Sequence, residues 1–148
     1  MKWRSHISEC FPDAKFVDPA PWEAVRNIET KLSITLPDDL KELYAETNGF
    51  LGYIGSSIVW TADEVLSRNL EMRSGYADLY MPFDCLLLFG EDGGGDFFGF
   101  RILSTGVEEW QTFRWVHETD SRIWYSGGLR DYIQRFGNTY YPKNENGA

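Results

Sequence analysis

Residues 83–102 read FDCLLLFGEDGGGDFFGFRI and contain the pattern on which the fold depends. The apolar run from Cys85 to Phe89 is too short for a free-standing helix and stops at Gly90, which favours a strand buried on both faces. An acidic, glycine-rich loop separates this run from a second β-prone segment at residues 97–102. Because glycines supply the backbone angles of a tight loop, the simplest connection is an antiparallel hairpin. We therefore expect this hairpin in the middle of a sheet, with Cys85 as a small apolar residue inside it.

Length and composition predict one packed domain. The chain has 148 residues, of which 43% are hydrophobic and 16% aromatic, so it can bury a substantial core without staples. Its formal net charge of -9 repels nucleic-acid phosphates and anionic membranes and favours basic partners. We therefore expect no direct nucleic-acid binding and no membrane binding. The same charge also suits any soluble protein, and it names no ligand by itself.

Cysteine usage and the N-terminal sequence predict a cytoplasmic protein. Cys10 and Cys85 are expected to be reduced thiols, because one pair is no disulfide framework and no C-x-x-C or Cys/His pairing predicts a zinc site. Residues 1–6, MKWRSH, are not followed by the apolar region of a signal peptide, and no run approaches the length of a membrane span.

Helical spacing of apolar residues predicts four helices. The first begins at Pro21, the second follows Pro37 and stops at Asn48-Gly49, and the third begins after a capping box formed by Thr61 and Glu64. The fourth is expected between an N-cap at Ser126 and a stop at Gly137-Asn138. The expected amphipathic faces are Trp22, Val25, Ile28 and Leu32 in the first; Leu40, Leu43, Tyr44 and Thr47 in the second; Val65, Leu66, Asn69, Leu70, Met72 and Arg73 in the third; and Leu129, Tyr132, Ile133 and Phe136 in the fourth.

The remaining segments complete a single α+β domain at residues 21–141 with a central, mostly antiparallel sheet packed by about four helices. Residues 1–20 lack sustained periodicity, and we expect an arm that packs over the core through Trp3, Phe11 and Phe16. Residues 142–148 are expected to form a flexible polar tail. Further strands are predicted at residues 57–60, 107–110, 112–117 and 122–125.

The acidic loop and the single His-Glu pair are the candidates for chemistry. Glu91, Asp92 and Asp96 offer oxygen ligands for calcium or magnesium, but the spacing of an EF-hand is missing and a hairpin turn is the simpler interpretation. His117 and Glu118 are neighbours on an expected strand, so they point to opposite faces and suit acid–base work poorly. We therefore assign no catalytic, metal-binding or cofactor-binding residue. A metal-dependent enzyme built on Asp92, Asp96 and His117 is kept as a third hypothesis.

Acidic and aromatic side chains instead predict a protein-binding surface. An acidic face speeds association with a basic partner, and tyrosine and tryptophan often dominate the affinity at the centre of an interface. The glycine-punctuated segment at residues 50–57 and the tyrosine-rich segment at residues 75–80 are the expected contact loops. The predicted partner-binding residues are Tyr53, Tyr76, Tyr80, Glu91, Asp92, Glu108 and Glu109.

Short motifs spread over most of the chain carry a family resemblance. They are Trp22 with Ile28-Glu29, Leu36-Pro37-Asp38-Asp39-Leu40 with Leu43-Tyr44, Asn48-Gly49, Phe89-Gly90, Gly95-Asp96, Trp115 with His117-Glu118, and the apolar helix that contains Leu129 and Phe136. In this order the chain resembles the SMI1/KNR4 family of the SUKH superfamily. The resemblance implies structural roles for the motif residues Trp22, Leu36, Pro37, Asn48, Gly49, Gly90, Gly95, Asp96, Trp115 and His117.

The resemblance implies a mixed α+β fold and a binding function. For many bacterial members, the resemblance implies an immunity protein that binds and neutralises a cognate polymorphic toxin domain, often a nuclease. The fungal relatives look like regulators or scaffolds of cell-wall signalling. The first hypothesis is thus a non-catalytic immunity protein, and the alternative is a scaffold or regulator that binds an endogenous signalling or cell-wall protein.

Overall fold

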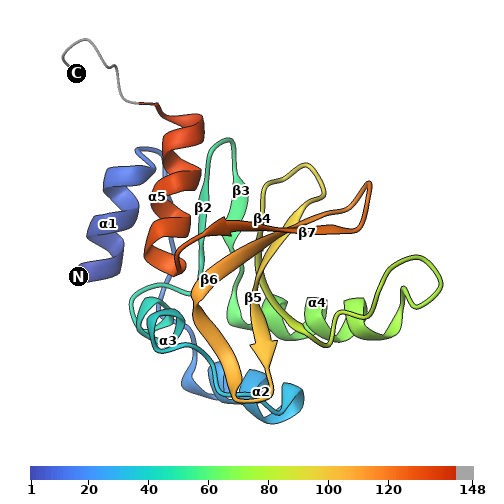
Figure 1. Ribbon diagram of the computed structural model, residues 1–148. Coiled ribbons are helices and arrows are strands. Elements are labelled where there is room, and N and C mark those ends of the chain that lie inside the picture. Colours follow the sequence, from blue (N-terminus) through green and yellow to red (C-terminus); the bar gives the residue numbers. More distant parts are fainter. Residues whose placement is uncertain (143–148) are drawn as a thin grey trace.

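The computed structural model describes residues 1–142, in which five helices and seven strands form an α+β domain (Figure 1). The predicted fold class is confirmed. Of the expected polar tail, everything after Pro142 lies outside the described residues. The helices are α1 (Lys2–Cys10), α2 (Trp22–Leu32), α3 (Asp38–Tyr44), α4 (Ala62–Ser74) and α5 (Leu129–Tyr140). The strands are β1 (Lys15–Phe16), β2 (Phe50–Gly52), β3 (Ser56–Val59), β4 (Leu86–Glu91), β5 (Phe97–Leu103), β6 (Gly106–Val116) and β7 (Ser121–Ser126).

The predicted hairpin is present, but its place in the sheet differs from the expectation. β4 and β5 pair antiparallel, as the apolar run and the glycine loop predict. The four-stranded sheet has the order β4-β5-β6-β7, so β4 lies at its edge instead of its middle. Cys85 precedes β4 and is exposed, because the buried run begins only at Leu86.

A second, three-stranded sheet of order β1-β2-β3 meets the first at β4. The Trp60 amide at the end of β3 donates a hydrogen bond of 2.8 Å to the carbonyl of Phe89. A Cβ atom on Gly90 would lie 2.0 Å from the Ile58 carbonyl oxygen, so only glycine allows this crossing. The pair Phe89-Gly90 is therefore the point where the two sheets touch.

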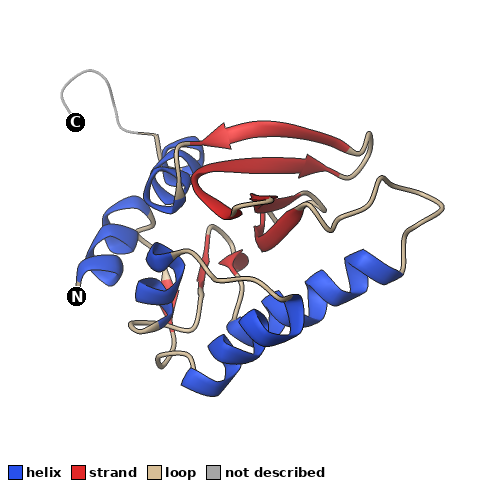
Figure 2. Cartoon of the chain, turned by 60° about the horizontal axis from the view of Figure 1, so that its bottom comes forward, coloured by secondary structure: helices blue, strands red, loops and turns tan. Residues whose placement is uncertain are grey.

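Helices enclose the sheets from several sides. α5 packs against the four-stranded sheet, where Tyr132 and Phe136 contact the ring of Phe98 (Figure 1). The hydroxyl of Tyr132 also donates 2.6 Å to the Ile58 carbonyl, which ties α5 to the second sheet. α2 and α4 pack side by side, as Figure 2 shows. The hydrophobic core thus contains side chains from both sheets and from the helices that pack on them.

The N-terminal segment is a helix and not an irregular arm. α1 buries Trp3 and Ile7, and Phe11 after its end is fully buried too. The carboxylate of Glu46 caps the helix by accepting hydrogen bonds of 3.0 Å from the backbone amides of Trp3 and Arg4. The capping residue lies more than 40 residues away in the chain, so the local sequence contains no capping pattern that would predict this helix.

Several expected helix faces and ends shift in the structure. Trp22 is 68% exposed and Leu70 43% exposed, so neither belongs to the core. α3 ends at Tyr44, before the expected stop at Asn48-Gly49. The predicted capping box of α4 is confirmed.

The last helix starts and ends later than expected. Its N-cap is Gly128, while the expected cap Ser126 donates a hydrogen bond to the Gly128 carbonyl. Gly137 lies inside α5, where a Cβ would stand 2.5 Å from the carbonyl oxygen of Cys10. It therefore permits close packing of α1 on α5, and does not end the helix.

Candidate functional site

Asp96 forms the centre of an ion-pair cluster at the β4–β5 loop. Its Oδ2 lies 2.9 Å from Nε of Arg114, and its Oδ1 accepts hydrogen bonds from the backbone amide of His117 (3.1 Å) and from Nδ1 of the same residue (2.6 Å). Since a carboxylate only accepts, Nδ1 carries the hydrogen. Register explains this contact, because Phe98 pairs with Arg114 and Phe97 with Trp115 across β5 and β6.

The other loop residues support the same cluster. Asp92 pairs with Arg114 at 2.8 Å and accepts hydrogen bonds from the amides of Gly94 (2.8 Å) and Asp96 (3.2 Å). Gly95 has φ +109, and a Cβ there would lie 2.9 Å from the imidazole of His117. The glycine thus makes room for the ring that binds Asp96.

The electrostatics of the cluster favour fixed charges over proton transfer. Burial opposes ionisation of Asp96, but the hydrogen bonds from His117 and Arg114 and the charge of Arg114 outweigh it and lower the pKa of Asp96 below its ordinary value of 3.8. A carboxylate held ionised in this way is a poor general acid or base near neutral pH. Within residues 1–142, no group of three or more His, Cys, Asp or Glu side chains is arranged to hold a metal ion.

Glu91 is also held by its neighbours. Its Oε2 accepts 2.8 Å from Nε1 of the buried Trp60 and lies 3.4 Å from Nη2 of Arg68. The guanidinium of Arg68 stacks over the Trp60 ring at 4.9 Å. Glu91 therefore joins β4 to α4 and is half-buried.

The tip of the β2–β3 hairpin lies beside this loop, at the same end of the molecule (Figure 1). A Cβ on Gly93 would come within 2.6 Å of Oγ of Ser56, which places the two loops in contact. Tyr53 stacks on Tyr140 of α5 with ring centroids 3.8 Å apart. Ile54 is 85% exposed with φ 55, a backbone angle that β-branched residues rarely adopt.

The tyrosine-rich link packs on the sheet through a different set of contacts. Tyr80 packs edge-on against the rings of Phe83 and the buried Trp115, and Tyr76 packs on Tyr80. Asp120 accepts hydrogen bonds of 2.8 Å from the Met81 amide and from Nε1 of Trp115. Both predicted contact tyrosines are therefore half-buried parts of this aromatic cluster.

Glu108 and Glu109 lie at the far end of β5 from the acidic loop. Glu108 pairs with Arg101 at 2.9 Å, and Glu109 accepts a hydrogen bond of 3.3 Å from the amide of Asp38 at the start of α3. The predicted partner-binding residues are thus divided into three separate groups: Tyr53, Glu91 and Asp92; Tyr76 and Tyr80; and Glu108 and Glu109.

The remaining motif residues lie at chain crossings and helix starts. Gly49 has φ +77, and a Cβ there would lie 2.4 Å from the Val59 carbonyl oxygen. The side chain of Asn48 accepts 2.8 Å from the Ala62 amide at the start of α4. Leu36 is buried, its amide donates 2.8 Å to Glu29, and the buried Pro37 follows it as the N-cap of α3.

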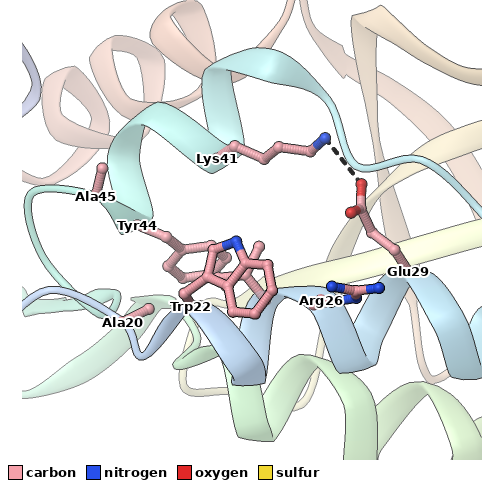
Figure 3. Close-up of a pocket in the computed structure, with 8 residues that line it drawn as sticks. Ala20, Trp22, Arg26, Glu29, Lys41, Tyr44 and Ala45 are labelled. Atoms are coloured by element: carbon pink, nitrogen blue, oxygen red, sulfur yellow. Dashed lines mark ion pairs between the residues drawn. The ribbon is translucent and has the colours of Figure 1, made fainter.

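A groove of about 440 Å³ between α2 and α3 was not expected from the sequence. Trp22 and Tyr44 form its aromatic side, and the ion pair of Lys41 with Glu29 (2.9 Å) lies at its other end (Figure 3). Arg26 stacks on the ring of Trp22 at 5.1 Å. The assignment of Trp22 to the buried face of the first helix concealed this groove.

Arg114 is the main residue that sequence reasoning missed in the loop cluster. The pairing of β5 with β6 places Arg114 beside Asp92 and Asp96, and this contact is not evident from the sequence. Alternation along β6 gave no signal for this ion pair, because it places Arg114 on the face opposite Phe113 and Trp115, where a charged side chain is usually solvated.

A comparison with known protein families matches most of the chain. The family model SUKH_6, described as SMI1-KNR4 cell-wall, matches residues 23–133. The chain belongs to the SMI1-KNR4 family. The matched region runs from α2 into α5, so α1 lies outside it. No curated protein matches the chain. None of the helices in the described residues has the length and apolar character needed to cross a bilayer.

Proposed function

We propose that this SMI1-KNR4 protein is a cytoplasmic immunity protein that binds and neutralises a basic toxin domain, without chemistry of its own. One observation carries the proposal: the residues best suited to chemistry are engaged with each other. Both oxygens of Asp96 are bound by Arg114 and His117, and Asp92 is paired as well. Because ion pairs hold these carboxylates, the loop suits recognition of another protein better than it suits catalysis.

The distribution of charge supports a basic partner. The net charge is -9, and several acids on the described surface belong to no ion pair, among them Asp38, Asp39, Asp63, Glu109 and Glu118. Nucleases need basic surfaces to hold phosphate backbones. An acidic protein that covers such a surface gains fast association and complementary charge.

The loops supply apolar contact after the electrostatic encounter. Ile54 stands at the tip of the β2–β3 hairpin, and its strained backbone angle is of the kind that proteins retain at binding sites. Leu79 in the tyrosine-rich link is 71% exposed. The proposed mechanism is steering by the acids followed by burial of these loops against the toxin.

Co-expression tests the proposal. The gene for this chain is expressed together with the reading frame next to it in its own genome, and growth and complex formation are measured. We expect rescue of growth and recovery of the toxin's C-terminal domain with the tagged protein in moderate salt. Absence of both would contradict the immunity function.

A second candidate is a scaffold or regulator of cell-wall synthesis, which the family description favours because it reads SMI1-KNR4 cell-wall. The same pulldown separates the two functions. Recovery of envelope-synthesis proteins alone, without protection of growth, would support the regulator.

A further inference from the structure

Trp110 lies in a wide bulge of β6. Arg101 and Phe100 are consecutive on β5, yet they pair with Glu108 and Thr112 on β6, so the residues between those two have no partner on β5. Bulges redirect side chains and commonly stand beside functional sites. Trp110 is 72% exposed, and Figure 1 shows that β6 bends sharply along its length.

Contacts on both sides hold the bulge in place. Gln111 donates 2.8 Å to Glu108, and Glu109 accepts from the amide of Asp38 in α3. Gly128, with φ +114, lets the start of α5 approach the Glu109 carbonyl, where a Cβ would lie at 3.2 Å. A side chain on such a fixed backbone loses little backbone entropy when it binds a partner.

Trp110 also differs from the other exposed tryptophans. Arg26 covers the ring of Trp22 at 5.1 Å, and Arg135 covers Trp124 at 5.0 Å. Among residues 1–142, no aromatic ring and no cation stacks on Trp110. Its π face is therefore open to a cation from outside the chain.

Acidic residues lie next to Trp110 in the chain and on α3, which contacts its bulge. Glu109 precedes Trp110, Asp38 contacts Glu109, and Asp39 follows Asp38 in the first turn of α3. None of these carboxylates has an ion-pair partner in the described part of the chain. We propose that Trp110 anchors the interface with the toxin domain by stacking on an arginine of a basic segment, which Glu109 and Asp38 attract.

Arginine fits this surface better than other groups. Its planar guanidinium stacks on aromatic faces and is weakly hydrated, so it is buried beside a tryptophan at a modest cost. A second copy of this chain is disfavoured, because two surfaces of the same negative charge repel each other. The inference rests on the proposed immunity function and adds to it the anchoring residue and the chemistry of the partner.

Binding measurements with the toxin domain recovered in the co-expression experiment test the anchor. Trp110→Ala is expected to raise the Kd by about tenfold or more, because truncation of an anchor residue weakens binding by that much. Trp124→Ala, at an exposed tryptophan on β7 whose ring Arg135 covers, is the matched control and should stay within about twofold. Trp110→Phe retains a π face and should fall between Trp110→Ala and wild type. Equal urea midpoints would show that the variants are folded.

The acids are tested by association kinetics. Glu109→Gln keeps an acceptor for the Asp38 amide but removes the charge, so association should slow by about two- to fivefold at low salt and depend less on salt. Glu118→Gln, at an exposed carboxylate in the β6–β7 turn, is the control for loss of one charge and should change the rate less.

The outcomes separate the two proposals. A wild-type protein that neither binds the toxin domain nor rescues growth overturns the immunity function and the anchor with it. Wild-type binding with unchanged affinity of Trp110→Ala overturns the anchor alone. A wild-type dimer that Trp110→Ala converts to monomer would assign the surface to self-association and would also overturn it.

Discussion

At the level of single residues, Gly90 allows the two sheets to approach closely because it has no side chain. Its Cβ position is 2.0 Å from the Ile58 carbonyl oxygen and 2.9 Å from the hydroxyl of Tyr132. We expect Gly90→Ala to destabilise the fold by at least about 2 kcal/mol, because backbone and a buried side chain must both move. Urea unfolding measures this loss.

Gly94→Ala is the control for that substitution. The nearest atom to its Cβ position is 3.5 Å away, on the side chain of Asp92, and its φ is not positive. Its stability should lie within about 1 kcal/mol of wild type. Equal losses for the two variants would contradict a specific clash at Gly90.

Asp96 predicts a pH dependence of stability. Its pKa is lowered in the folded state, so its contribution is present above its ordinary value of 3.8 and is lost as the pH falls through the lower folded value. Asp96→Asn should cost about 1–3 kcal/mol at neutral pH. The difference from wild type should close in acid below pH 3.8.

Chemical unfolding at a series of pH values measures this difference. Glu118→Gln, at an exposed carboxylate in the β6–β7 turn, serves as control and should remain close to wild type throughout. A gap between Asp96→Asn and wild type that stays constant into strong acid would show that the ionised form of Asp96 does not stabilise the fold.

At the scale of elements, Asn69 of α4 completes the free edge of β4. Its side chain donates 2.8 Å to the Leu88 carbonyl and accepts 2.9 Å from the Leu88 amide, while donating 2.7 Å to Val65 within the helix. We expect Asn69→Ala to cost about 2–4 kcal/mol, because two buried backbone groups lose their partner. Hydrogen exchange of the Leu88 amide should accelerate.

Leu70→Ala in the same helix is the comparison variant. Leu70 is 43% exposed, so its loss should change stability by less than about 1 kcal/mol and leave the Leu88 amide protected. An unchanged exchange rate at Leu88 in Asn69→Ala would instead mean that β4 does not depend on this side chain.

Helices and strands of this protein differ in how accurately their sequences predict them. α4 was predicted with its start, because Thr61 and Glu64 form a local capping box. The two β-prone runs at residues 107–110 and 112–117 are one bent strand, since β6 passes through its bulge without ending. Local sequence patterns therefore predict those helices and strands that are stabilised by contacts between residues close together in the chain.

At the scale of the whole molecule, α1 is part of the core although it precedes the region that matches the family. A chain that begins at residue 21, the expected start of the domain, lacks Trp3, Ile7 and Phe11, all of them buried. Burial of such side chains is worth about 1.5–3 kcal/mol each, which approaches the total stability of a typical domain. We expect this shortened chain to lose cooperative unfolding.

Point variants in the full chain measure how much single residues of α1 contribute to stability. Trp3→Ala should cost about 3–5 kcal/mol, whereas Lys2→Ala, at an exposed neighbour, should cost less than about 1 kcal/mol. Thermal or urea unfolding measures both. A cooperative transition of wild-type stability in the chain that begins at residue 21 would show that α1 is dispensable.

Features that depend on neighbours in the chain could be predicted from the amino-acid sequence. These are the β4–β5 hairpin, the capped start of α4, the apolar faces of α2 and α5 apart from Trp22, and the family, which its ordered motifs indicated. Four features became visible only in the folded chain: the position of β4 at a sheet edge, the pairing of Asp96 with Arg114, the capping of α1 by Glu46 and the exposure of Trp110 on a bulge. Periodicity and capping act over a few residues, whereas ion pairs, close approaches at glycine and strand order depend on segments that meet only when the whole chain is folded.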